Sequence, residues 1–75
     1  MKAKEMFEKL GYKLFINADT EICYMSKENK WFISFYLDEK VIQCSENDFY
    51  TTSIGITLEE LQAINKQVEE LGWYE

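Results

Sequence analysis

The chain has 75 residues, enough for one domain with a small core, and it contains 5 Phe, 5 Tyr and 2 Trp but no proline and no histidine. Its formal net charge is −6, and all of its positive residues are lysines. Arginine is the usual reader of phosphates and guanine edges, so direct nucleic-acid binding is not expected, and no apolar run is long enough to span a membrane.

The N-terminal segment predicts a short helix that leads into a sheet. Ala3, Met6, Phe7 and Leu10 recur at spacings of three and four. Gly11 is the expected end of this helix, because glycine readily adopts the left-handed conformation that closes helices. Immediately after Gly11 the apolar period changes to two, which is typical of strands. The sequence predicts strands at residues 12–16, 22–25, 31–37 and 41–44.

Short polar breaks separate these strands, at residues 17–20, 27–30 and 38–39. Breaks of this length favour hairpins, so the predicted sheet is an antiparallel meander. Residues 45–48 form a polar loop in this interpretation. Residues 49–54 have strand-like composition without clean alternation, so they are either a fifth, edge strand or an ordered loop that leads to the last helix.

The C-terminal segment predicts a longer helix with defined ends. Thr57 is a good N-cap, and Glu60, three residues later, completes a capping box. Gly72 is the expected end, followed by Trp73, which can fold back onto the last turn. Two helices, each apolar on one stripe, predict a two-layer α+β single domain of order α-β-β-β-β-α with both helices on one sheet face. The predicted stripe of the second helix consists of Leu58, Leu61, Ile64, Asn65, Val68 and Leu71.

Alternation along the strands sorts their side chains into two faces, although a slip of one residue would exchange them. The face expected under the helices carries Leu14, Ile16, Ile22, Tyr24, Ile33 and Phe35. The opposite face carries Phe15, Cys23, Met25, Phe32 and Tyr36.

An apolar second face is unusual, because antiparallel sheets covered on one side commonly direct polar residues to water. We therefore hypothesise an interface, with a protein partner or a second copy, formed by Phe15, Met25, Phe32 and Tyr36. Two alternatives stay open: residues 45–56 or a chain end fold across this face, or the side chains are scattered surface aromatics.

A second candidate surface is acidic. Glu59, Glu60, Glu69 and Glu70 form a ridge on the C-terminal helix. The simplest interpretation is a solvated helix face. The functional alternative is an antagonist of a nucleic-acid-binding protein, in which the carboxylates mimic phosphates.

Catalysis is not expected, and no cofactor or metal site is predicted. The chain lacks a histidine base and a glycine-rich phosphate loop, and its acidic residues do not follow the spacing of a metal-binding loop. Glu46 and Asp48 are paired carboxylates in a polar loop, where solvation is the expected state. Cys23 and Cys44 are expected to be reduced thiols in a cytoplasmic protein, with a disulfide between them as the alternative.

The two ends of the chain resemble known sequences. M-K-A-K-E-M-F-E-K-L-G-Y and I-T-L-E-E-L-Q-A-I-N-K-Q-V-E-E-L-G-W are similar to small uncharacterised proteins of phages and prophages of Gram-positive bacteria. The likeness covers residues 1–12 and 56–73, with a looser match through the predicted sheet. It implies an accessory protein in a bacterial cytoplasm that acts by binding host or phage proteins, without assigning a role to any residue.

Overall fold

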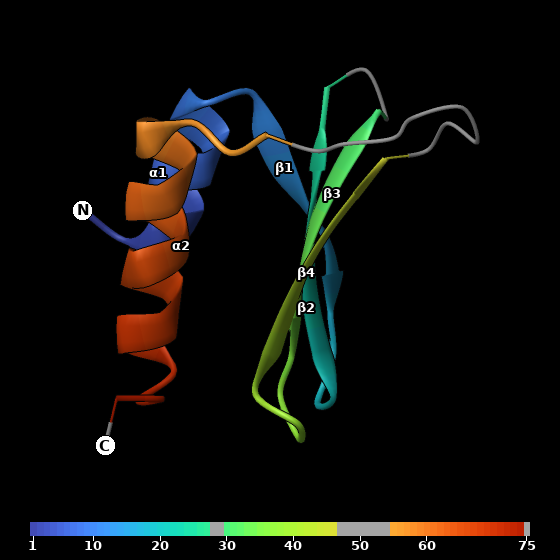
Figure 1. Cartoon of the computed structure of the whole chain (residues 1–75), viewed down its shortest axis with the longest axis vertical. Helices are drawn as coiled ribbons and strands as arrows, with labels where there is room; N and C mark the ends of the chain where they lie inside the picture. Colours follow the sequence, from blue (N-terminus) through green and yellow to red (C-terminus); the bar gives the residue numbers. More distant parts are fainter. Residues whose placement is uncertain (28–29, 47–54, 75) are drawn as a thin grey trace.

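A computed structural model describes residues 1–27, 30–46 and 55–74. The four strands form one antiparallel sheet in the order β1-β2-β3-β4, and both helices lie on the same side of it (Figure 1). The predicted α+β class, element order and meander are confirmed. The question of a strand or a loop at residues 49–54 lies outside the described residues. The elements are α1 (Ala3–Lys9), β1 (Tyr12–Asn17), β2 (Glu21–Ser26), β3 (Trp31–Tyr36), β4 (Val41–Glu46) and α2 (Leu58–Glu70).

Local chemistry explains where α2 begins and ends. Thr57 Oγ1 accepts a hydrogen bond from the Glu60 N–H at 3.1 Å, and Glu60 Oε1 accepts one from the Thr57 N–H at 2.8 Å, which completes the predicted capping box. At the other end Gly72 has a φ of 73°, and the Trp73 N–H donates to the Val68 carbonyl at 3.2 Å. This Schellman arrangement satisfies a carbonyl that the helix itself leaves free.

Aromatic rings fill the layer between helices and sheet. Phe7 of α1 stacks on Tyr24 of β2 with ring centroids 4.0 Å apart, and Phe35 of β3 meets both rings edge-on. Trp73 folds back as predicted and contacts Phe35, with ring centroids 6.3 Å apart. These rings provide much of the buried area that a domain of this size needs. The buried cluster consists of Phe7, Tyr12, Tyr24, Ile33, Phe35, Ala63, Ile64 and Val68.

The buried face of α2 differs from the predicted stripe. Leu58 and Leu61 were expected to be buried, but they are 65% and 45% exposed. Ala63 and Gln67 are buried instead, together with the predicted Ile64 and Val68. The helix is rotated from the leucine stripe because Ala63 is small enough for close packing and Gln67 finds a hydrogen-bond partner, Tyr24, inside the core.

A β-bulge in β1 corrects the predicted faces. Leu14 pairs with Tyr24, but Ile16 pairs with the preceding residue of β2, Cys23, so Phe15 is an extra residue. Directly opposed residues point to the same side of a sheet, so Ile16 lies on the face away from the helices. The expectation that Ile16 lies under the helices is wrong. The placement of Leu14, Ile22, Tyr24, Ile33 and Phe35 on the helix side is confirmed.

Candidate functional site

The sheet surface opposite α1 and α2 is the candidate interaction surface, called the open face below. No helix of the described chain lies over it (Figure 1). The register of the three strand pairs defines its members. They are Lys13, Phe15, Ile16, Glu21, Cys23, Met25, Phe32, Ser34, Tyr36, Val41, Gln43 and Ser45.

Large apolar side chains on this face reach solvent. Phe15 is 55% exposed, because the bulge pushes it out of the regular ladder, and its ring lies 6.3 Å from the half-buried ring of Phe32. Tyr36 is also half-buried, and its hydroxyl donates to Gln43 Oε1 at 3.1 Å. Phe15, Phe32 and Tyr36 therefore lie on one surface, in the combination that the sequence predicts.

The centre of the open face is closed to solvent. Met25, the fourth residue of the hypothesised interface, lies on this face but is only 7% exposed, so it supplies little contact area. Cys23 and Ser34 are opposite each other and buried, with Ser34 Oγ 3.3 Å from Cys23 Sγ in a hydrogen bond. Both cysteines are free thiols, and Cys44 lies on the other side of the sheet, opposite Ile33.

Two carboxylates of the acidic ridge make hydrogen bonds inside the molecule. Glu60 accepts from the hydroxyl of Tyr12 as well as from its helix cap. Glu70 Oε2 accepts from the backbone N–H of Ala3 at 2.8 Å, at the first turn of α1. This carboxylate opposes the dipole of its own helix but complements that of α1.

The other two members of the ridge lie on the surface. Glu69 pairs with Lys66 at 3.4 Å, and Glu59 is exposed in the first turn of α2. The four carboxylates therefore do not form a uniform free surface, because two of them are hydrogen-bonded to other elements of the fold.

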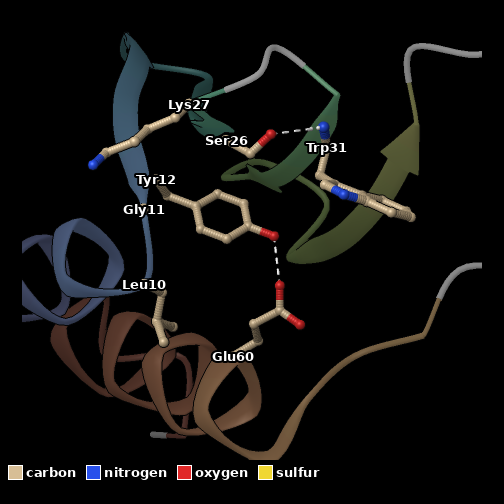
Figure 2. A pocket seen from close by; sticks show the side chains of 7 residues that line it. All are labelled: Leu10, Gly11, Tyr12, Ser26, Lys27, Trp31 and Glu60. Carbon is tan, nitrogen blue, oxygen red and sulfur yellow. Dashed lines mark hydrogen bonds between the residues drawn. The ribbon is translucent and has the colours of Figure 1, made fainter.

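A cavity of about 350 Å³ lies where the start of α2 meets the ends of β1, β2 and β3 (Figure 2). Partial burial acts to raise the pKa of Glu60, but hydrogen bonds from Thr57 and Tyr12 outweigh it and hold this pKa below its usual value. Burial and the neighbouring Glu60 raise the pKa of Tyr12. At neutral pH an ionised acceptor and a protonated donor therefore satisfy each other. The lining residues are Leu10, Gly11, Tyr12, Ser26, Lys27, Trp31 and Glu60.

This arrangement serves the fold more than chemistry. A carboxyl with a lowered pKa is a poor general acid at neutral pH. Both oxygens of Glu60 also already accept hydrogen bonds, from Tyr12 and from Thr57. Of the other carboxylate pair considered above, Glu46 lies at the end of β4 and Asp48 falls outside the described residues. In the described ranges, no three His, Cys, Asp or Glu side chains are grouped so that they can hold a metal ion.

Sequence reasoning missed both carboxylate contacts between elements. Tyr12 and Glu60 are 48 positions apart, and Ala3 and Glu70 are 67 apart, so no local pattern connects them. The one available signal was the presence of Glu70 in the last turn of α2, where a carboxylate is unfavourable unless something positive is near.

No family model, curated protein or solved structure matches this chain. Among the described residues, neither helix has the length and apolar character needed to cross a bilayer.

Proposed function

We propose that this protein is a non-enzymatic protein–protein interaction module that acts through its open face, and that a second copy of the chain is its first partner. The observation that carries the proposal is Phe15, which is exposed beside Phe32 on a sheet face that no described helix covers. Fully burying a phenylalanine side chain contributes about 1.5–3 kcal/mol, and 55% of Phe15 is still exposed, so covering it favours association.

Charge favours this face over the rest of the surface. The whole chain carries −6, which makes two copies repel each other in most orientations. The open face carries one lysine, Lys13, and one glutamate, Glu21, at different ends of the first hairpin. It has no net charge, so two copies that meet through it avoid most of the repulsion.

The setting of this activity is part of the proposal. Free thiols at Cys23 and Cys44 fit a reducing compartment, which supports a cytoplasmic protein. The resemblance of the chain ends to phage and prophage proteins supports an accessory role, in which a host or phage protein is a further partner of the same face. The internal bonds of Glu60 and Glu70 leave the acidic antagonist with less support.

The molecular mass in solution, measured by light scattering, tests the proposal. The wild type is expected to be larger than a monomer, and the Phe15→Lys, Phe32→Lys and Tyr36→Lys variants are expected to form smaller assemblies. Leu58→Lys is the matched control, because it places the same charge on an exposed apolar position of α2. Circular dichroism establishes that each variant is folded.

Salt separates this contact from an acidic one. Apolar association is expected to persist as ionic strength rises, whereas attachment through carboxylates weakens steeply. A monomeric wild type, or a loss of assembly with Leu58→Lys but not with Phe15→Lys, would show that the open face is not the contact surface.

A further inference from the structure

The outer edge of β4 is a second surface that is suited to contact with another chain. β4 is the last of the described strands and pairs with β3 without a break, from Tyr36 opposite Val41 to Trp31 opposite Glu46. Val41 is 49% exposed and Ile42 is 37% exposed. In the part of the chain that the structure describes, no strand pairs with the other side of β4.

The two edges of the sheet are not equivalent. Natural edge strands avoid pairing with other chains through bulges, prolines and charged residues, particularly lysine. β1 has two of these features, the bulge at Phe15 and the exposed Lys13. β4 is six residues of regular strand without proline, lysine or bulge, and its only charge is Glu46 at one end. The edge at β1 is therefore protected by its own residues, and the residues of β4 itself supply no such protection.

We propose that β4 pairs with β4 of a second copy, antiparallel and around a two-fold axis at Gln43, so that two sheets join into one of eight strands. The surface involved is the strand edge, so the proposal does not depend on the open face. A two-fold contact is the commonest form of self-association and requires a surface that complements itself.

The hydrogen-bond pattern of the sheet fixes which backbone groups of β4 point outward. The Leu37 N–H donates to the Thr20 carbonyl at 3.0 Å, one step beyond the pair of Glu21 and Tyr36. Leu37 and Thr20 are thus a hydrogen-bonded pair, and such pairs alternate with non-bonded ones along an antiparallel ladder. The backbone groups of Tyr36, and of every second residue before it, therefore point away from β2 and toward β4. Gln43, opposite Ser34, therefore bonds inward to β3, and Ile42 and Cys44 direct their backbone groups outward.

Only registers that oppose outward-facing residues are possible, and the register centred on Gln43 is one of them. In this register Ile42 of each copy lies opposite Cys44 of the other, and both of these pairs are hydrogen-bonded. The register also brings Lys40, in the turn before β4, to Glu46 of the second copy at each end. Lys40 is exposed and Glu46 is half-buried, so this register sets opposite charges against each other at both ends of the contact.

A cysteine cross-link tests both the contact and its register. In a Cys44→Ser background, Gln43→Cys places two thiols across the axis at a non-hydrogen-bonded pair, where side chains are closest. Oxidation by glutathione disulfide is expected to give a covalent dimer. Val41→Cys in the same background is the matched control. Position 41 lies on the same sheet face, but in this register the two introduced thiols are offset by four residues along the strands, about 14 Å, which is too far for a disulfide. The native Cys23 is buried and does not compete.

A second variant tests the edge by mass. The N–H of Ile42 points outward, so Ile42→Pro removes a donor from the edge while leaving the bonds to β3 in place. If both proposed contacts form, the wild type is a tetramer and Ile42→Pro or Phe15→Lys each halves the mass. Cross-linking through Gln43→Cys is expected to survive Phe15→Lys.

The two proposals fail in different ways. Equal cross-linking of Gln43→Cys and Val41→Cys, or none in protein that is folded, would overturn edge pairing. An assembly that Phe15→Lys dissolves and Ile42→Pro leaves unchanged would also overturn edge pairing and would retain the open face.

Discussion

Tyr24 of β2 donates a hydrogen bond of 2.7 Å to Oε1 of Gln67 on α2, and both side chains are buried. Burial, together with the negative charges of Glu70 and Glu8, raises the pKa of Tyr24 to about 12. Tyr24 therefore remains a protonated donor across the physiological range. This bond fixes the rotation of α2 over the sheet, because a glutamine can be buried there only if its amide is satisfied.

Tyr24→Phe is expected to lower the free energy of unfolding by about 1–3 kcal/mol, because it leaves Gln67 Oε1 buried without a donor. Urea denaturation of dilute protein measures the change. Tyr36→Phe also removes a tyrosine–amide bond, but an exposed one, and is expected to change stability by less than about 0.5 kcal/mol. Equal losses in the two variants would contradict the role given to the buried bond.

Glu60→Gln is expected to destabilise the protein by about 1 kcal/mol at neutral pH, since it weakens the capping box and the bond from Tyr12. The pKa of Glu60 is lower in the folded state than its usual value, so its charge stabilises the fold above that value and this stabilisation is lost as pH falls. Denaturation of both proteins as a function of pH tests this. The difference is expected to shrink below about pH 4, and a constant difference would contradict the assignment.

Glu70→Gln and Glu69→Gln are a matched pair on neighbouring positions. Glu70→Gln is expected to reduce stability by about 0.3–1 kcal/mol, because it removes the negative charge bonded to Ala3 at the start of α1. Glu69 pairs with Lys66 on the surface, and its replacement is expected to have almost no effect. The loss in Glu70→Gln is expected to be greater at low salt. Thermal unfolding of both variants at two ionic strengths distinguishes the two roles.

Gly11→Ala and Gly55→Ala separate backbone conformation from side-chain space. A methyl group has room at both positions, with no heavy atom within 4 Å, but Gly11 has a φ of +91° and Gly55 has no positive φ. Gly11→Ala is expected to cost about 1–2 kcal/mol, because it forces alanine into the left-handed region at the end of α1. Gly55→Ala is expected to be neutral. Similar urea midpoints for the two variants would show that the conformation of Gly11 is not restrictive.

Local signals in the sequence were sufficient for most of the fold. Each of these features depends on residues within a few positions of each other, so a single sequence is enough to predict it. They include the cap at Thr57, the positive φ of Gly11 and Gly72, and the four strands. β4 extends two residues beyond its expected end because Ser45 and Glu46 pair with β3, and pairing with another strand overrides the polar character of the segment.

The rotation of α2 and the bulge could not be predicted, because each depends on a distant segment. Hydrophobicity alone favours Leu61 over Gln67 for burial, and only the presence of Tyr24 reverses that choice. Alternation places Phe15 and Ile16 on opposite faces, and only the register against β2 shows that Ile16 has changed side. Of the hypothesised interface, Phe15 is as exposed as expected, whereas Met25 is buried, which alternation along one strand does not predict.

The hydrogen bond between Ala3 and Glu70 spans 67 positions of the chain, whereas each pairing among the four described strands joins neighbours in sequence. Closing a long loop costs more conformational entropy than forming a hairpin and is therefore slower. The meander can assemble first, and the joining of the two helices comes late. Substitutions at the helix–helix contact should consequently accelerate unfolding and leave the refolding rate almost unchanged, which gives this small protein a kinetic weak point where its first and last elements meet.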